Sequence, residues 1–482
     1  MTDPTWATAD EIATAVASGA VSAQAVAARM LRRIAEIEPA INAYTDVTAE
    51  RARAEAAHVD AAIALGRDPG PLAGVPFAVK NLFDVAGLPT RAGSRINRDR
   101  PPARADAILI RRLRRAGAVL VGTLNMGEYA YDFTGENAHD GACRNPHDTG
   151  RMSGGSSSGC GAATAAGLAP ISLGSDTNGS LRVPAALCGV FSLKPTYGRL
   201  PRSGTFSFVD SLDHLGPFAR GTRDLALAYD AMQGHDPGDH GCAARPVEPV
   251  TDLLDRGVDG LRIGIPGGWF ARHAGAAADA AERAADALRS LGTTLSRPDL
   301  DAAEAGRAAA YLITNAESAA FHLERLRARA AEFDPDTRDR FLAGALLPAS
   351  WSVRAQRVRA WWLRRALGVF GEVDALLVPA TPVAAPRIGQ KVLALNGAEH
   401  PLRPTLGMLA QPFSCIGLPV VTVPLFTAGE LPVGLQVVAR PWQEALALRI
   451  ARSLEGIGLA QAHPPGRILA GGQTGSRDAA RR

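Results

Sequence analysis

Apolar residues with helical spacing dominate the first part of the chain. Residues 8–19, with the sequence TADEIATAVASG, predict a short helix. Thr8 and Glu11 have the spacing of a capping box, and Gly19 is placed to end the helix. A second, longer helical pattern follows and is predicted to end near Pro39, because proline interrupts the hydrogen bonds of a helix interior.

Short aliphatic runs follow, and they predict buried strands. Residues 71–90, PLAGVPFAVKNLFDVAGLPT, predict a strand that ends at Lys80 and then a loop. Residues 105–125 predict a helix and then the strand AVLVG, and residues 160–176 predict a helix of small residues and then a strand. Nearer the C-terminus we expect strands within residues 373–386, 420–426 and 434–440, and a helix around residues 408–419. Helices that alternate with buried aliphatic strands favour an α/β fold.

The segments between these elements indicate how the chain is organised. Residues 133–160 are rich in Gly, Ser, Asn, His and Asp and predict a long loop, of a kind that is usually functional inside a compact domain. Residues 233–260 predict an exposed connector, and a helix-rich insert follows at about residues 260–370. Strand patterns flank this insert, so we expect one domain over residues 1–465. Residues 466–482 predict a disordered tail.

Composition narrows the classes of function. Of the 482 residues, 46% are hydrophobic and only 5% aromatic, which predicts an aliphatic, alanine-rich core. No apolar run of about 18 residues occurs, so no membrane span is predicted. The N-terminus lacks the pattern of a secretion signal, which favours the cytoplasm. The net charge of +4, without basic runs mixed with aromatics, argues against direct nucleic-acid binding. The five scattered cysteines form no CxxC pair and indicate neither a disulfide framework nor a metal site.

Lysine is rare in this chain, which makes each lysine informative. Only three of the 52 basic residues are lysines, namely Lys80, Lys194 and Lys391. Arginine stays protonated in proteins, whereas a buried lysine can lose its proton and act as a base. Lys80 follows the apolar run GVPFAV, where burial favours the neutral amine, so a catalytic lysine and a buried ion pair are both open. Lys194 is expected to be structural, and Lys391 lies in a loop-like stretch.

Two stretches offer a serine as a nucleophile, which needs a base to become reactive. In GGSSSGCG, residues 154–161, the pattern around Ser157 matches a nucleophile elbow, but loop-like residues precede it instead of a strand. A tight turn is the alternative interpretation. In GSDTNGSLRVPA, residues 174–185, Ser180 stands among residues too small to cover the backbone, so a ligand could approach it closely.

Residues 154–185, GGSSSGCGAATAAGLAPISLGSDTNGSLRVPA, resemble the amidase signature. In that family a serine of the Gly-rich loop lies 24 residues before a second serine followed by an aliphatic residue, Arg, any residue and Pro, and Ser156 and Ser180 fit. Lys80 ends a strand of the family's PFAVK type. The resemblance extends to residues 431–439. It implies an α/β fold, with one large domain and a mixed central sheet flanked by helices on both faces.

The resemblance implies a Ser–cis-Ser–Lys triad that works through an acyl-enzyme. Ser180 would be the nucleophile, and neutral Lys80 would take its proton through Ser156. A cis peptide bond would hold Ser156 at its own nitrogen. Backbone N–H groups would stabilise the negative charge that forms on the substrate oxygen. The resemblance assigns these groups to Thr177, Asn178, Gly179 and Ser180.

Further roles follow from the same resemblance. Asp176 and Arg182 flank the nucleophile and are expected to form a buried charge pair that shapes the loop. Ser157 is expected to be a supporting hydrogen-bond donor or a turn residue, and Tyr129 lies where the family lines its acyl pocket. Asn178 departs from the Gly or Ala of the family. Its amide would narrow the pocket and favour small polar substrates, unless it is a turn residue that faces away.

Within the family the chain looks most like the carboxybiuret hydrolases of s-triazine and cyanuric acid breakdown, on stretches such as RNPHDTGR and GLRIGIPGGWF. This resemblance implies an amidohydrolase that cleaves the C–N bond of a small amide or ureide carboxylate and releases ammonia, with no cofactor. It also implies a homo-oligomer and a small accessory subunit, similar to the small GatC component of tRNA-dependent amidotransferases.

Alternative functions remain open. The chain could be the glutaminase component of a glutamyl-tRNA(Gln) or aspartyl-tRNA(Asn) amidotransferase, or a general small-amide amidase. A catalytically silent structural subunit is disfavoured, because all three triad residues are present. A His-dependent serine hydrolase would use Ser157, or Ser180 together with Asp213 and His214, and is disfavoured because Lys80 supplies a base.

Overall fold

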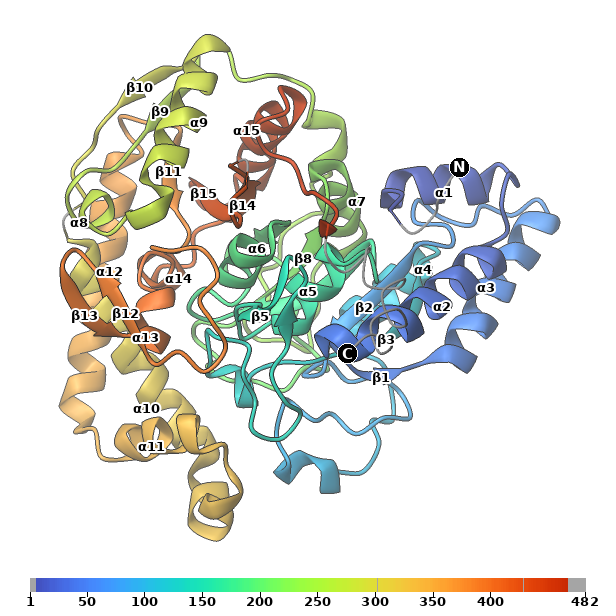
Figure 1. Ribbon diagram of the computed structural model, residues 1–482, viewed down its shortest axis with the longest axis horizontal. Coiled ribbons are helices and arrows are strands. Elements are labelled where there is room, and N and C mark those ends of the chain that lie inside the picture. The colour runs from blue at the N-terminus through green and yellow to red at the C-terminus, as the bar shows by residue number, and fades with distance from the viewer. Residues whose placement is uncertain (1–5, 301, 428, 467–482) are drawn as a thin grey trace, which may run out of the picture.

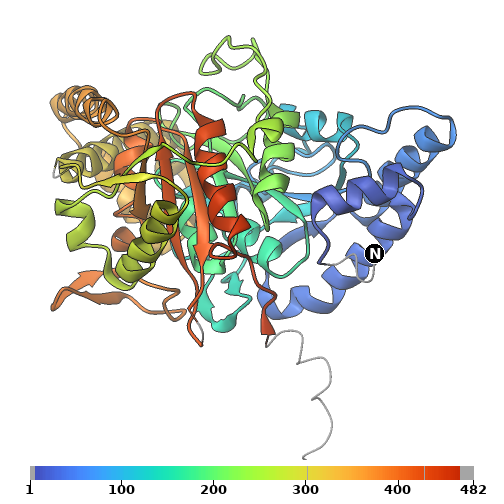
Figure 2. The ribbon, with the colours of Figure 1, turned by 90° about the horizontal axis from the view of Figure 1, so that it is seen from above.

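One mixed sheet of eleven strands forms the centre of the molecule, in the order β1-β3-β2-β6-β8-β7-β14-β15-β11-β9-β10. The computed structural model describes residues 6–300, 302–427 and 429–466. Helices lie on both faces of the sheet (Figures 1 and 2). The sheet strands are β1 (Tyr44–Val47), β2 (Pro76–Lys80), β3 (Val119–Leu124), β6 (Ile171–Asp176), β7 (Phe191–Lys194), β8 (His214–Ala219), β9 (Arg262–Gly264), β10 (Thr294–Ser296), β11 (Ala375–Pro379), β14 (Val420–Leu425) and β15 (Val433–Ala439). The predicted α/β class with a mixed sheet is confirmed.

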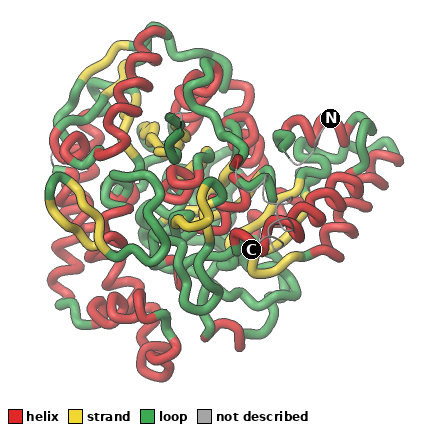
Figure 3. The backbone as a smooth tube through the Cα atoms, in the orientation of Figure 1, coloured by secondary structure: helices red, strands yellow, loops and turns green. Residues whose placement is uncertain are grey.

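The helices fall into groups along the sheet. In Figure 1 the first helices lie beside β1 to β3, and α8 to α12 lie at the opposite end of the molecule. Long loops, green in Figure 3, connect the elements. The helices are α1 (Ala9–Ala17), α2 (Ala23–Ile41), α3 (Ala49–Ala64), α4 (Ile108–Arg115), α5 (Ser158–Ala165), α6 (Arg182–Cys188), α7 (Thr222–Met232), α8 (Gly268–Arg272), α9 (Ala278–Ser290), α10 (Ala303–Arg329), α11 (Pro335–Ala345), α12 (Ala349–Val369), α13 (Leu402–Leu406), α14 (Gln411–Cys415) and α15 (Glu444–Gly456).

Several local predictions can be compared with these bounds. The capping box of Thr8 and Glu11 is present at α1. The helix α2 continues through Pro39 to Ile41, where Asn42 ends it in a left-handed conformation (φ 53°). A proline in the last turn is tolerated because few helical hydrogen bonds follow it.

Other stretches are more structured than the sequence pattern indicated. The predicted loop at 133–160 contains a short hairpin of β4 (Arg144–Asn145) and β5 (Asp148–Met152). A second hairpin, β12 (Val392–Leu395) with β13 (Ala398–Pro401), was not predicted. The helix-rich stretch at about 260–370 also supplies two strands, β9 and β10, to the main sheet. The predicted tail at 466–482 lies outside the described residues after its first residue.

The order of the strands positions the chemistry. Strands β2 and β6 are parallel neighbours, with Val79 opposite Leu173. Their carboxyl ends therefore lie at the same edge of the sheet. Lys80 is the last residue of β2, and Asp176 is the last residue of β6. The turn that carries Ser180 leaves this edge and leads into α6. No helix within the described residues is long and apolar enough to cross a membrane.

The helix that follows this turn packs very closely on the sheet at Gly434 of β15. A Cβ at Gly434 would lie 2.4 Å from the Cβ and 2.7 Å from the Cα of Ala186 in α6. Contacts this short are not sustained by real side chains, so α6 would have to move away from the sheet. Only glycine allows the observed approach.

We expect Gly434→Ala to lower the free energy of unfolding by about 1–3 kcal/mol, because overpacking of a tight core forces backbone shifts. Urea denaturation measures this change. The matched control is Gly368→Ala in α12, where nothing lies within 4 Å of the added Cβ. This substitution should leave stability unchanged or raise it by up to about 1 kcal/mol, since alanine favours helix. Equal stability of both variants would contradict the packing argument.

Candidate active site

Lys80 lies in a buried hydrogen-bonded cluster with two serines. Its Nζ is 2.7 Å from Ser156 Oγ and 2.9 Å from Ser175 Oγ. Lys80 and Ser156 are fully buried. The Gly155–Ser156 peptide bond is cis, at the position where the family resemblance places one. The structure thus brings together two of the three residues of the expected triad in direct contact.

Burial changes the chemistry of this lysine. Removal from water lowers the pKa of Lys80 from 10.5 to about 7. The nearby carboxylates of Asp213 and Asp176 oppose burial but do not outweigh it. A substantial fraction of Lys80 is therefore neutral near pH 7 and can accept a proton. Burial lowers the pKa of Lys194 to about 7 as well, but its Nζ donates hydrogen bonds to the carbonyl oxygens of Pro195 and Leu418 and not to hydroxyls, which is a structural role.

Asp176 holds the turn that carries Ser180. Its Oδ1 accepts the N–H of Gly179 at 2.7 Å, and its Oδ2 accepts the N–H of Leu181 at 3.1 Å. Both residues that flank Ser180 are thus fixed by one carboxylate. Gly179 has a φ of 140°, a backbone conformation that favours glycine.

Arg182 in turn fixes Asp176. The guanidinium Nε and Nη2 each lie 3.0 Å from one oxygen of the Asp176 carboxylate, and both side chains are fully buried. Burial alone would raise the pKa of Asp176, but the charge and hydrogen bonds of Arg182 outweigh it and hold that pKa well below its usual range. Arg182 Nη1 donates to Ala410 O at 2.8 Å and to Gln436 Oε1 at 2.7 Å, and Nη2 also donates to Ser414 Oγ in α14. The ion pair therefore ties the Ser180 turn to α14 and β15.

The geometry of this turn corrects one expectation about the oxyanion donors. The N–H of Gly179 is already bound to Asp176, so it is not free to face a substrate. Among the described residues, no acceptor binds the N–H groups of Thr177, Asn178 and Ser180. These three amides remain as candidate donors. The Thr177 side chain is held by Asp213, whose Oδ1 accepts its hydroxyl at 2.6 Å.

Ser180 opens onto a small cavity between the sheet edge and the helices α10 and α11. Thr177 and Asn178 line it together with Ser180. The other lining residues are Ala130, Tyr131, Asp132, Phe133, Phe208, Tyr311, Thr314, Arg340 and Gln411. The side chain of Asn178 points toward α10, where its Nδ2 donates to Thr314 Oγ1 at 2.8 Å. It is therefore part of the cavity wall.

Tyr129 does not line this cavity. Its ring lies 4.1 Å from that of His322 and 5.5 Å from that of Phe333, in an aromatic cluster. Tyr129 and Ala130 both have positive φ, at 48° and 62°, and this turn brings Tyr131 to the cavity. Tyr131, and not Tyr129, is thus the tyrosine of this turn that lines the Ser180 cavity.

Arg340 brings positive charge to the cavity. Its guanidinium lies 3.9 Å from the centre of the Tyr131 ring and donates to Tyr131 O at 2.9 Å. No carboxylate among the described residues forms an ion pair with Arg340. Asp132, the acidic residue of the cavity wall, is already paired with Arg403. The cavity therefore contains a cation whose charge is not neutralised by a neighbour.

A second arginine, Arg307, binds a residue of the cavity wall. Arg307 Nε donates to Gln411 Oε1 at 3.0 Å, and its Nη2 donates to Pro404 O at 3.0 Å. Because Arg307 binds the carbonyl end of the Gln411 side chain, the NH2 end is left as the group that can face the cavity. The lining of the cavity thus combines the guanidinium of Arg340 with the amide donor of Gln411.

The residues that a His-dependent serine hydrolase would use bind other groups in this structure. Ser157 Oγ bonds with the backbone of Ser175, at 3.0 Å to its O and 3.2 Å from its N. His214 Nδ1 lies 2.6 Å from Leu212 O and 3.1 Å from Asp176 O. Neither Ser157 nor His214 is among the residues that line the Ser180 cavity.

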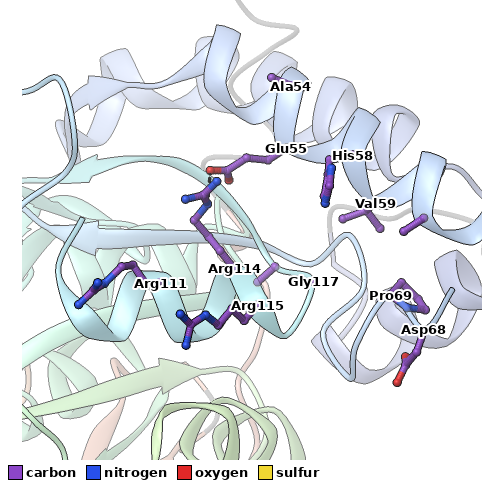
Figure 4. Close-up of a pocket in the computed structure, with 12 residues that line it drawn as sticks. Ala54, Glu55, His58, Val59, Asp68, Pro69, Arg111, Arg114, Arg115 and Gly117 are labelled. Atoms are coloured by element: carbon purple, nitrogen blue, oxygen red, sulfur yellow. Dashed lines mark ion pairs between the residues drawn. The ribbon is translucent and has the colours of Figure 1, made fainter. Parts of the chain in front are cut away.

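A larger groove of about 640 Å³ lies elsewhere, between α3 and α4 (Figure 4). Its lining includes Glu55, His58, Arg111, Arg114 and Arg115, and Glu55 is paired with Arg114 at 2.5 Å. The lining contains no serine, cysteine or lysine. It therefore offers none of the nucleophiles considered above.

Sequence reasoning missed several residues of the site. Ser175 contacts Lys80. The feature that could have indicated this contact is the position of Ser175 on a buried strand, which in the fold lies beside the strand of Lys80. Thr314 on α10 and Arg340 on α11 carry no local motif. They lie more than a hundred residues after Ser180, and only the folded arrangement of the helices brings them to the cavity.

The pKa of Lys80 sets an expected pH dependence. Lys80 can accept a proton only when neutral, so kcat/KM for ammonia release should fall as the pH drops below about 7 and level off above it. Lys80→Met should lower kcat/KM by about 10²–10⁴-fold, as expected for loss of a general base. Initial rates between pH 5.5 and 8.5 provide the measurement. A flat profile, or an active Lys80→Met enzyme, would rule out this role.

Comparisons with known proteins identify the family of this chain. The sequence model of the Amidase family matches residues 25–448. The chain is 52% identical over 453 residues to AtzE, the 1-carboxybiuret hydrolase subunit of Pseudomonas sp. (strain ADP), covering 94% of this chain and 98% of that protein. It is 40% identical over 474 residues to a glutamyl-tRNA(Gln) amidotransferase subunit of Anaeromyxobacter dehalogenans (strain 2CP-C), covering 92% and 95%.

A solved structure supports the same assignment. It is described as "An unexpected vestigial protein complex reveals the evolutionary origins of an s-triazine catabolic enzyme". It matches with a TM-score of 0.92 at 51% identity, over 95% of this chain and 100% of that chain. The chain therefore belongs to the Amidase family and is a hydrolase that acts on carbon–nitrogen bonds.

Proposed function

We propose that the protein hydrolyses a small amide or ureide that carries a carboxylate, of the carboxybiuret type, and releases ammonia. The observation that carries this proposal is a cavity in which Ser180 and the unpaired cation Arg340 lie together. A substrate with a carboxylate at one end and an amide at the other would place the carboxylate at Arg340 and the amide at Ser180. The 52% identity to a 1-carboxybiuret hydrolase subunit supports the same class.

The proposed mechanism uses a relay of two hydroxyls and one amine. Neutral Lys80 takes a proton from Ser156 as Ser156 takes one from Ser180, and Ser180 Oγ attacks the carbonyl carbon. The free N–H groups of the Ser180 turn stabilise the negative oxygen. The relay then returns the proton to the leaving nitrogen, and ammonia departs. Water attacks the ester left on Ser180, again with Lys80 as the base, and the acid is released.

A glutaminase component of an amidotransferase is the second candidate function. The 40% identity to a glutamyl-tRNA(Gln) amidotransferase subunit favours it. Arg340 would serve glutamine equally well, since glutamine also has a carboxylate. The α-ammonium of glutamine separates the two candidates, because Asp132, the acidic residue of the cavity wall, is already paired with Arg403.

We also propose that the chain works as a homo-oligomer with a small accessory subunit, in the cytoplasm. The related structure is described as a protein complex, which supports a partner. The cysteines are unpaired and buried, as is usual in a reducing compartment. Helices α10 to α12 expose large apolar side chains that a partner could cover, namely Phe321, Leu342, Leu346, Trp351 and Trp361.

The covalent step provides the first test. Ser180→Ala should abolish ammonia release from small amide carboxylates, because the variant lacks the attacking oxygen. Mass spectrometry of rapidly quenched wild-type enzyme should show an acyl group on the peptide that contains Ser180. The control is Ser157→Ala, which should retain most of the activity. An acyl group on another residue would contradict the proposed mechanism. Glutamine turned over faster than every small ureide would favour the glutaminase.

The role of Arg340 is tested with a matched pair of amides, succinamate and butyramide, which differ only in the terminal carboxylate. Arg340→Met should lower kcat/KM for succinamate by about 10–100-fold, the usual effect of losing a charge-assisted hydrogen bond. Butyramide hydrolysis should change little. Arg340→Lys should recover part of the succinamate activity, since lysine keeps the charge but not the paired donors. Equal losses on both amides would argue against carboxylate recognition.

A further inference from the structure

Asn178 has one end of its side-chain amide bound and the other end unpaired. Its Nδ2 donates to Thr314 Oγ1 at 2.8 Å. Its Oδ1 is buried, and no group in the described residues donates a hydrogen bond to it. Buried acceptors are nearly always paired in native proteins, and an unpaired one calls for an explanation. A donor supplied by the substrate is such an explanation, because Asn178 lines the cavity of Ser180.

Thr314 binds the nitrogen of the Asn178 amide, and the oxygen is unpaired. Thr314 is buried on α10 and lines the same cavity. An Asn side chain has two donors on its nitrogen and an acceptor on its oxygen. With Nδ2 bound to Thr314, the group that remains for a ligand is the acceptor. The ligand must therefore bring an N–H or O–H to this point.

The position of Asn178 in the chain limits which atom of the substrate this is. Asn178 precedes Ser180 by two residues in the same turn and lines the same cavity, so a substrate whose carbonyl is attacked by Ser180 would bring the atoms next to that carbonyl toward the Asn178 side chain. In a ureide the atom next to that carbonyl is N–H, whereas in a plain carboxylic amide it is CH2. The leaving NH2 is present in both classes and cannot distinguish them.

We propose that Asn178 Oδ1 accepts the N–H adjacent to the scissile carbonyl and thereby selects ureides over plain amides, with Thr314 as the residue that positions it. This inference rests on the proposed function, because it specifies the substrate class of the same site. A CH2 at this point would leave Oδ1 buried and unpaired in the transition state. Sites built around such a hydrogen bond discriminate strongly against analogues that lack the donor.

Two stable substrates isolate this one group. N-carbamoylglycine and succinamate both have a carboxylate, the same chain length and the same leaving NH2. They differ only by NH or CH2 next to the scissile carbonyl. Ammonia release gives kcat/KM for each, and the ratio of the two values is the readout. The different intrinsic reactivity of ureas and amides cancels when this ratio is compared between wild type and variants.

Two pairs of variants test the roles. Asn178→Ala and Thr314→Val should each lower the N-carbamoylglycine to succinamate ratio by about 10-fold or more. Asn178→Asp keeps an acceptor, and Thr314→Ser keeps the hydroxyl. Both should keep the ratio within about threefold of wild type, even where the added charge of Asn178→Asp lowers both rates, because the hydrogen bond that discriminates is preserved.

The outcomes separate this inference from the proposed function. A wild-type enzyme that hydrolyses both substrates, with a ratio unchanged in Asn178→Ala, would overturn the inference and leave the proposed function standing. Loss of the ratio in Asn178→Asp as well as in Asn178→Ala would also overturn it, since an acceptor would then not be the cause. A wild-type enzyme that hydrolyses neither substrate would overturn the proposed function and this inference with it.

Discussion

The buried ion pair of Asp176 and Arg182 is the constraint on which the rest of the site depends. Two full charges removed from water are stable only when each is well hydrogen-bonded, and here every oxygen of Asp176 is bound. The same oxygens bind the amides on either side of Ser180. The ion pair of Asp176 and Arg182 thus sets the position of Ser180. Removal of either partner would leave the other as an uncompensated buried charge.

The site is assembled from two parts of the fold that do different work. Strands β2 and β6, the turn after β6 and the loop between β5 and α5 supply the amine, the hydroxyls and the backbone donors. Helices α10 and α11 supply Thr314 and Arg340, which face the same cavity from the other side. The residues that react lie at the sheet edge and in its loops, whereas the recognition groups come from α10 and α11 together with Asn178 of the Ser180 turn.

The separate origin of the reacting residues and the recognition residues explains how much of the site could be predicted from the sequence. Lys80 and Ser156 could be placed together because each belongs to a motif of the family that the chain resembles. The N–H of Gly179 could not be assigned, since its bond to Asp176 depends on the three-dimensional path of the turn. Arg340 has no motif at all. Its place results from how α11 packs on α10, which periodicity alone does not determine.

The separate origin of the recognition groups has a consequence for how activities diversify on this scaffold. A change confined to α10 and α11 would alter the wall that meets the substrate while every atom of the amine–hydroxyl relay stayed in place. Specificity could therefore change through substitutions within one contiguous stretch, residues 303–345, that leave the residues of the relay unaltered.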